Sequence, residues 1–441
     1  MHDTYCLCPR YSYGAWHLTR TREWSSIGWK HEPQPKEGYR ALAENPTIRV
    51  ADKDIQLKEI ADKEAWQALL PSVSASLSLS HSIQVAAIKT AMGEFKMGAD
   101  GSTTATGGLT MTLPIYAPAV YQNMKMTKED ILLAQEKARS SRLDLINQVT
   151  KAYYAALLSK DSRDVIQRSY NVAKQNYEVV DKKFQVGKVS EYDKITAEVQ
   201  MRSMGSSVTS AETGLTLALL RLKVLMGIKT DIDINITDSL KAYEKDLTLA
   251  KAEVNESELS NNTSVRQLDM SQNMLERSTK LLRTNFLPTV AMQLQGSYTS
   301  YSNDNWNVFK YKYSPASSLA LSVTIPIFQA SNWTKLKSNK IQIDQLADTR
   351  TNTMRQLSMA AQSYRKNMLT TITKLESDRE AVRQADKAVT ISAKRYDVGR
   401  GTILELNQSE TALTQAELTY HQSIYDYLTN KADLDYTLGR E

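Results

Sequence analysis

The pattern of apolar and polar positions shows a strand period in four short stretches. In residues 73–80 every second residue is Val, Ala or Leu and the others are Ser, and a similar alternation occurs in 109–115, 290–298 and 319–325. A period of two places apolar side chains on one face of a strand and polar side chains on the other. The sequence therefore predicts four strands that form two hairpins, at 70–115 and 287–327. The polar segments 98–108 and 300–318 are expected to be loops inside these hairpins.

Helical stretches account for most of the remaining chain. Three helices are expected in each half, at 44–68, 119–186 and 190–226 in the first and at 261–285, 331–398 and 402–438 in the second. The middle helix of each set contains no Gly or Pro and would extend about 100 Å at 1.5 Å per residue. The last helix ends before Gly227 or Gly439, a residue type that suits a helix C-terminus. Mostly polar surfaces on such helices are typical of coiled-coil pairing or of water on two sides.

The order of elements is repeated because the chain contains an internal duplication. Shifted by 217 residues, 49–73 aligns with 266–290, and shifted by 212 residues, 182–188 aligns with 394–400. Several such matches in the same order indicate a duplicated half rather than a solenoid repeat. We divide the chain into four parts, an atypical N-terminal tail at 1–38, a first repeat at 39–227, a connector at 228–260 and a second repeat at 261–441.

The tail differs in composition from the rest of the chain. It holds Cys6 and Cys8, three of the five His and three of the six Trp, without hydrophobic periodicity. It also lacks the apolar core of a secretory signal, so no export signal is visible in this sequence. We interpret 1–38 as a loose tail or an incorrectly assigned start.

Composition and charge exclude several classes of protein. The 55 Lys and Arg exceed the 49 Asp and Glu by six, which is too small a surplus to indicate a nucleic-acid partner. No window approaches 18 apolar residues, so a membrane role would use strands or a surface helix. With no phosphate loop, nucleophile motif or metal-ligand spacing, we expect no enzyme activity, no cofactor and no metal site.

Four strands in one chain leave two open sheet edges. In lipid these edges would carry unpaired backbone groups, and eight strands is the usual minimum for a membrane barrel. The strands therefore either belong to a soluble sandwich or close a barrel by oligomerisation. Three copies would supply twelve strands, with the Ser/Thr/Gln faces lining a wet lumen and the Val/Leu/Met/Ile faces meeting lipid.

The order helix, hairpin, long helix, tight turn, long helix in two copies resembles the TolC family of outer-membrane efflux channels. The resemblance covers residues from about 40 to 441. Its most specific motifs are Phe184-Gln-Val-Gly187 and Tyr396-Asp-Val-Gly399, which are similar to the family's aromatic-x-Val-Gly turn at the periplasmic tip. Leu70-Pro71 and Leu287-Pro288 enter the hairpins, and Pro114-Ile115-Tyr116 and Pro326-Ile327-Phe328 leave them.

The resemblance implies a fold that is mainly α with a membrane β-barrel. It would be a homotrimer with a twelve-stranded outer-membrane barrel, in outer-membrane lipid, and an α-helical barrel in the periplasm. It also implies a passive exit duct, gated at the helical tip, that works with a periplasmic adaptor and an inner-membrane pump. The alternative is an envelope coiled-coil interaction protein, such as an adaptor with a small β-domain.

Candidate gating residues gather at the two tip turns. They are Phe184, Val186, Gly187, Asp193, Tyr396, Val398, Gly399 and Glu405. The resemblance implies a hydrogen-bonding gate role for Tyr396 and an acidic tip ring that includes Glu405, weakened here because the next family acid is Gln408. In the simpler interpretation, the carboxylates of Asp193 and Glu405 only stabilise their own helices, because negative charge near a helix N-terminus interacts favourably with the helix dipole. The alternative interpretation is that Phe184 and Tyr396 are packing aromatics at helix ends and that Gly187 and Gly399 serve only to reverse the chain.

Basic and aromatic residues supply two further hypotheses. One hypothesis is that the basic residues at the turns contact an adaptor or form ion pairs that close the gate. The alternative is that they are only solvated charges at helix ends. These residues are Lys182, Lys183, Lys188, Lys394, Arg395 and Arg400. The aromatic run in 298–313 is either a loop cluster or part of an interfacial belt.

Overall fold

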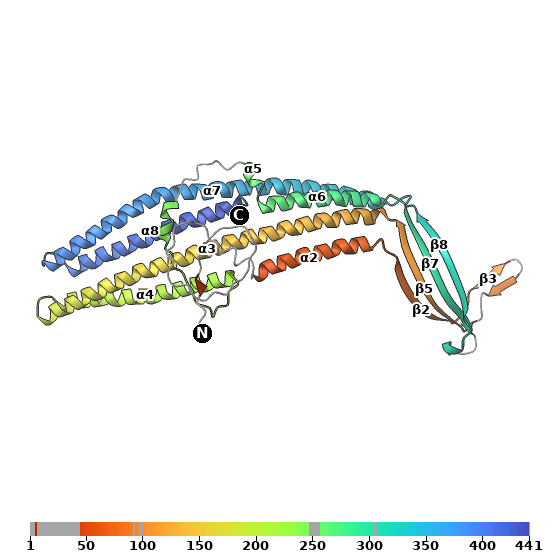
Figure 1. Ribbon diagram of the computed structural model, residues 1–441, viewed down its shortest axis with the longest axis horizontal. Coiled ribbons are helices and arrows are strands. Elements are labelled where there is room, and N and C mark those ends of the chain that lie inside the picture. Colours follow the sequence, from red (N-terminus) through yellow and green to blue (C-terminus); the bar gives the residue numbers. More distant parts are fainter. Residues whose placement is uncertain are drawn as a thin grey trace. The chain divides into compact units, whose positions relative to one another are not determined.

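The computed structural model describes residues 5–6, 45–90, 93–96, 100–246, 256–302 and 307–440 (Figure 1). Apart from Tyr5 and Cys6, the tail at 1–38 lies outside the described residues, as do Trp306 and part of the connector. Strand β1 (Tyr5–Cys6) pairs in parallel with β6 (Ile234–Asn235).

The long helices occur as three pairs of equal length. Helices α2 (Pro46–Gln67) and α6 (Thr263–Thr284) have 22 residues each. Helices α3 (Pro118–Gln185) and α7 (Ala330–Asp397) have 68, and α4 (Glu191–Leu225) and α8 (Ile403–Thr437) have 35. Two shorter helical pieces lie in the connector, η1 (Leu240–Asp246) and α5 (Glu256–Leu259). No helix in the described ranges has an apolar stretch long enough to cross a membrane.

The helix ends follow local sequence signals. Asn45 caps α2 by accepting a hydrogen bond from the Thr47 amide at 2.8 Å, and Asn262 caps α6 by accepting one from the Ser264 amide at 2.8 Å. Gly227 and Gly439 follow α4 and α8 with φ of +67° and +66°. Only a residue without a Cβ adopts this conformation at little cost, so the predicted C-terminal glycines are confirmed.

Four long strands form one antiparallel sheet in the order β2-β5-β7-β8. They are β2 (Ser72–Ser82), β5 (Ser102–Tyr116), β7 (Thr289–Ser302) and β8 (Ser314–Thr324). The predicted fold class, mainly helical with four strands in duplicated halves, is confirmed. The inner pair β5–β7 joins the two repeats.

The strand register places the apolar residues of all four strands on the same face. Val73 lies opposite Met111, Met111 opposite Leu294, and Leu294 opposite Leu319. In the adjacent row the facing residues are polar, namely Ser74, Thr110, Gln295 and Ser318. Because directly opposed residues share a face, the sheet has one apolar and one polar surface.

The strands are longer than the alternation predicted. The polar segments 98–108 and 300–318 were expected to be loops, but β5 begins at Ser102, β7 continues to Ser302 and β8 begins at Ser314. Close packing explains the two glycines in β5, since a Cβ at Gly107 would lie 2.8 Å from Leu77 Cδ2 and one at Gly108 would lie 2.9 Å from a carbonyl oxygen. A second small hairpin, β3 (Ala87–Thr90) with β4 (Gly93–Lys96), occupies part of the intervening segment.

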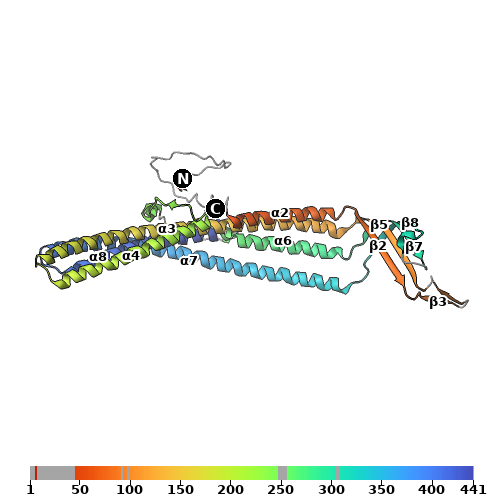
Figure 2. The ribbon, with the colours of Figure 1, turned by 90° about the horizontal axis from the view of Figure 1, so that it is seen from below.

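Two compact units divide the chain, and each draws on both repeats. One unit contains the residues up to Lys53 together with Glu136–Gln267 and Arg350–Glu441, and the other contains Asp54–Gln135 and Leu268–Thr349. In the second unit α6 lies between α3 and α7 (Figure 2). Arg277 of α6 contacts Glu129 of α3 at 3.3 Å, and Asn339 of α7 donates to the Leu275 carbonyl at 2.9 Å. The repeats are therefore interleaved rather than folded as separate domains.

In the first unit α4 runs along α3 and α8 runs along α7 (Figure 1). α4 and α8 also contact each other. The core of this unit is built from both repeats and the connector, and includes the fully buried side chains of Leu157, Leu222, Leu240 and Ile424.

Candidate functional site

The turn between α3 and α4 is a Schellman motif. The Gly187 amide donates to the Phe184 carbonyl at 2.8 Å, and the Lys188 amide donates to the Lys183 carbonyl at 2.8 Å. Gly187 has φ of +70°, and a Cβ there would meet no atom within 4 Å. Backbone conformation, and not space, is therefore what favours glycine at this turn.

The turn between α7 and α8 has the same backbone structure. The Gly399 amide donates to the Tyr396 carbonyl at 3.1 Å, and the Arg400 amide donates to the Arg395 carbonyl at 2.8 Å. Gly399 has φ of +73°, again with open space around a Cβ. The sequence match between 182–188 and 394–400 thus corresponds to a matched pair of helix reversals.

The carboxylates that follow the two turns have different surroundings. Asp193 belongs to a capping box, because its amide donates to Ser190 Oγ at 3.1 Å and its carboxylate accepts from the Ser190 amide at 3.2 Å. The Glu405 amide donates to Thr402 Oγ1 at 3.2 Å, but its carboxylate lies 3.5 Å from the Arg395 guanidinium. Asp193 is therefore held by its own helix end, whereas Glu405 faces the preceding helix.

A small apolar cluster joins the two turns. Val180 of α3, Ala197 of α4, and Ile403 and Leu406 of α8 are buried together. Partly buried neighbours complete the cluster, namely Tyr177, Val189, Ala393 and Tyr396. Since all four helices contribute, the cluster keeps the two hairpin ends in contact.

Charged groups connect the same ends. Lys183 Nζ lies 4.7 Å from the centre of the Tyr396 ring and 3.8 Å from Asp397 Oδ1, so it links α3 to α7. Within the first hairpin, Lys194 Nζ lies 2.7 Å from Asp181 Oδ1, and this contact lowers the pKa of Asp181 and raises the pKa of Lys194. The Lys194–Asp181 pair was not singled out in the sequence, since neither residue belongs to the repeated turn motif, whereas Lys183 and Tyr396 were both candidates.

Two polar atoms near the turns lack a hydrogen-bond partner in the described part of the chain. They are the Tyr396 hydroxyl and Glu405 Oε2, both of which are buried. Burial raises the pKa of Tyr396, and the charges of Asp193 and Asp397 add to the effect. Glu405 Oε2 lies 3.5 Å from the Arg395 guanidinium, so only the Tyr396 hydroxyl has no polar partner of either kind and is a candidate for a contact that a single copy does not supply.

The remaining residues predicted for this site lie at the surface. Val186 and Val398 are 68% and 70% exposed, at the apex of their turns. Arg395 is exposed and, besides facing Glu405, donates to the Arg400 carbonyl at 3.3 Å. Among the described residues no carboxylate lies within ion-pair distance of the other four basic side chains, Lys182, Lys188, Lys394 and Arg400, which are exposed. In the parts that the structure describes, no cluster of three metal-ligating side chains occurs.

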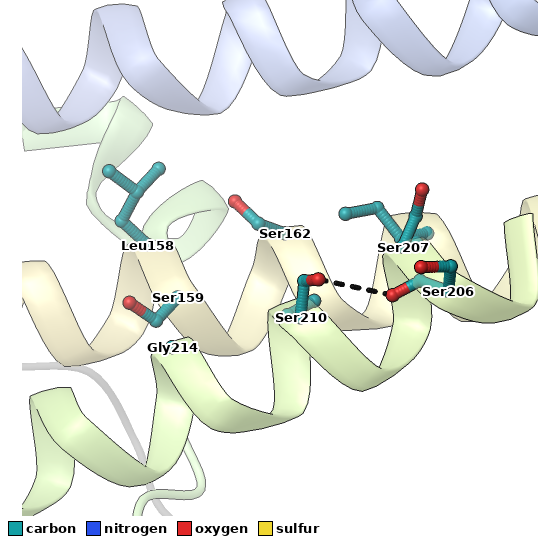
Figure 3. A pocket seen from close by; sticks show the side chains of 9 residues that line it. Leu158, Ser159, Ser162, Ser206, Ser207, Ser210 and Gly214 are labelled. Atoms are coloured by element: carbon teal, nitrogen blue, oxygen red, sulfur yellow. Dashed lines mark hydrogen bonds between the residues drawn. The ribbon is translucent and has the colours of Figure 1, made fainter. Parts of the chain in front are cut away.

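An open groove lies between α3 and α4 (Figure 3). It is lined by Leu158, Ser159, Ser162, Ile166, Ser206, Ser207, Ser210, Ala211 and Gly214. Ser210 Oγ donates to the Ser206 carbonyl at 3.1 Å, a bond within α4 itself. Apart from Leu158 and Ile166 the lining side chains are small, and none is charged, so the groove offers no group that would hold a charged ligand.

The aromatic run in the second hairpin is partly exposed. Tyr301 and Phe309 are 77% and 97% exposed, whereas Tyr311 is buried. The run is therefore not one packed cluster, but whether it meets a membrane interface stays a prediction.

The chain is similar in sequence to known outer membrane proteins. The chain matches the family described as "Outer membrane efflux protein" over residues 38–228 and 254–440. It is 20% identical over 343 residues to the outer membrane protein TolC of Vibrio cholerae, covering 76% of each chain. It is 21% identical to TolC of Salmonella enteritidis, covering 91% of this chain and 80% of that protein.

Solved structures show the same fold at low identity. The Campylobacter jejuni outer membrane channel CmeC has a TM-score of 0.71 and 18% identity, over 92% of this chain and 85% of CmeC. The open state of the Neisseria gonorrhoeae outer membrane channel MtrE has a TM-score of 0.70 and 18% identity, over 92% and 88% of the two chains.

Proposed function

Because the chain belongs to the outer membrane efflux protein family, we propose that three copies form the outer-membrane exit duct of a tripartite efflux pump. The duct conducts solutes passively and carries out no chemical step, so it needs no cofactor. Energy comes from an inner-membrane pump, and a periplasmic adaptor connects that pump to the duct.

The observation that carries this proposal is the exposed apolar face of the sheet. Leu77, Leu319 and Leu321 are 91%, 69% and 66% exposed on that face, although Leu is normally buried in a folded chain. Edge strands β2 and β8 pair with no further described strand. A cyclic arrangement of three sheets would give twelve strands, satisfy both edges and turn the apolar faces toward lipid.

The turns at 186–189 and 398–401 are the proposed gate. Their apolar cluster and the Lys183–Tyr396 contact hold the ends together within one chain, and threefold symmetry would bring three such ends to one axis. Glu405, whose side chain is 45% exposed beside Arg395, is the proposed source of an acidic constriction there. Asp193 is a weaker contributor, since its capping box already uses the carboxylate.

The proposed adaptor surface consists of the exposed valines and basic side chains at the turns. Val186 and Val398 supply an apolar apex, and the exposed cations around them suit an acidic or carbonyl-rich partner surface. Lys183 and Arg395 are less available for this role, because both already face groups of their own chain.

Conductance of the detergent-purified protein in a planar lipid bilayer tests the proposal. We expect small cation-selective steps, and we expect the double substitution Asp193→Ala and Glu405→Ala to reduce their selectivity. Steps with unchanged selectivity would keep the channel and reject the acidic ring. Absence of steps, from a protein that is also monodisperse without detergent, would favour the coiled-coil interaction protein instead.

A further inference from the structure

A partly buried histidine lies where three elements of the first unit meet. The His421 side chain on α8 is 12% exposed, and its Nδ1 lies 3.6 Å from Oδ2 of Asp161 on α3. The third element is η1, which begins at Leu240 and contacts α8. His421 and His81 are the two histidines of the described residues.

The Asp161 carboxylate fixes the start of η1. Its Oδ2 accepts hydrogen bonds from Ser239 Oγ at 2.9 Å and from the Leu240 amide at 2.8 Å. Leu240 itself is fully buried in the core of this unit. A carboxylate from α3 therefore caps η1 from outside that helix, in the manner of an N-cap side chain.

The imidazole of His421 is packed against this junction without a hydrogen bond at Nδ1. That atom is buried, and 3.6 Å to Asp161 exceeds hydrogen-bond distance. The charged groups that face the ring are Asp161 and Arg168 from α3, Glu417 from α8 and Lys241 from η1. Arg168 and Glu417 also pair with each other at 3.4 Å.

Burial dominates the proton equilibrium of this ring. Burial lowers the pKa of His421, with Arg168 and Lys241 acting in the same direction and Asp161 and Glu417 opposing it. The packed junction therefore favours the neutral imidazole, whereas a solvated His421 takes up a proton near its ordinary pKa of 6.5. By linkage, acidification below about pH 6.5 shifts the equilibrium toward conformations in which this ring reaches water.

We propose that the junction of His421, Asp161 and Ser239 is an acid-sensitive latch, in which neutral His421 keeps η1 packed against α3 and α8 and its protonation loosens η1. The latch lies in the connector region, does not involve the tip turns, and does not depend on the proposed gate. It would make the attachment of the connector respond to mild acid.

Amide hydrogen exchange of the full-length, detergent-purified protein tests the latch. The readout is the opening equilibrium of the peptide that contains 239–246, corrected for the intrinsic pH dependence of exchange. We expect opening in the unsubstituted protein to rise at least about threefold between about pH 7.5 and 5.5. His421→Gln should abolish this rise, and His81→Gln, which alters a histidine on β2, should retain it. An equal rise in His421→Gln would overturn the proposal.

A surface substitution keeps the test decisive if His421→Gln does not fold. Lys241 is exposed, and its positive charge helps to keep His421 neutral. Lys241→Gln should therefore fold and show a smaller acid-induced rise in opening than the unsubstituted protein. An unchanged or larger rise in that variant would count against the latch.

Discussion

Lys183 of α3 lies above the ring of Tyr396 of α7, with its Nζ 4.7 Å from the ring centre, so the two helical hairpins are linked at their ends by a cation–π contact. The same ammonium lies 3.8 Å from Asp397. The Asp397 side chain is 72% exposed, so water screens the ion pair and the ring contact is the stronger of the two interactions.

Lys183→Met is predicted to loosen the tip. Loss of this partly exposed cation–π contact costs about 0.5–1 kcal/mol, which corresponds to a change of roughly two- to fivefold in the ratio of open to closed states. The open fraction of single channels in a planar bilayer measures this change. Lys182→Met is the matched control, since Lys182 is exposed and faces no carboxylate among the described residues. An equal effect of both substitutions would reject the contact as a closing element.

Substitution of glycine by alanine is predicted to lower the stability of the protein at some positions and to raise it at another. Gly187→Ala and Gly399→Ala should each lower stability by about 1–2 kcal/mol, because L-residues are strained at φ near +70°. Gly214→Ala, within α4 and with open space around a Cβ, should instead raise stability by about 0.5–1 kcal/mol. Thermal unfolding in detergent compares the three variants.

Gly439→Ala is predicted to be the most harmful substitution of this series. It combines φ of +66° with a Cβ placed 2.5 Å from the Asn261 carbonyl oxygen, so the backbone must also move. A thermal midpoint no lower than that of Gly187→Ala would contradict this steric argument.

Glu410 is predicted to destabilise the first unit at neutral pH. Burial raises its pKa, although Asn176 Nδ2 donates to Glu410 Oε1 at 2.6 Å and opposes the shift. A raised pKa in the folded state means that the stabilising contribution of the neutral acid is present below about pH 4.5 and is lost as the pH rises through the folded-state pKa.

Glu410→Gln tests this pH dependence, because the amide oxygen can still accept from Asn176 and carries no charge. We expect its thermal midpoint at pH 7 to be about 1–3 °C above that of the unsubstituted protein, with the difference vanishing near pH 4. Glu212→Gln is the control, since Glu212 is exposed on α4 and lies within ion-pair distance of no described cation. A difference that persists at pH 4 would refute the assignment.

The open edges of the sheet are predicted to meet between copies. In a background with Cys6→Ser and Cys8→Ser, Ser74→Cys on β2 should form disulfides with Ser318→Cys or Ser322→Cys on β8 of the next copy. Two positions on β8 are used to cover alternative registers. Denaturing electrophoresis should show a covalent ladder that stops at three chains. Single-cysteine variants are the controls, and a ladder that stops at two chains would exclude threefold closure.

The two faces of the sheet are predicted to tolerate charge differently. Leu294→Arg introduces a cation on the apolar face and should cost about 2–4 kcal/mol if that face meets the middle of a membrane. Gln293→Arg places the same charge one residue earlier, on the polar face, and should have little effect. The yield of membrane-inserted protein in the two variants, compared at equal expression, measures the difference. Equal yields would argue against a lipid-facing surface.

The sequence by itself determined the repeated order of elements and most of the helix ends. Apolar periodicity identifies strands and helices because each face must match its surroundings, and Asn262, Gly187 and Gly399 mark helix ends because their local backbone chemistry is specific. It misjudged the strand lengths, since the polar and glycine-rich start of β5 is held by its neighbours across the sheet and not by its own alternation.

Only the tertiary structure decided which side chains act together. The pairing of β5 with β7, the stacking of Lys183 on Tyr396 and the capping of η1 by Asp161 join residues from distant parts of the chain, and no local pattern records such contacts. Asp193 and Glu405 illustrate the difference, because they occupy equivalent positions in the repeat and yet have different partners. The duplication fixed the backbone of both turns, whereas divergence of the surrounding side chains gave each carboxylate its own environment.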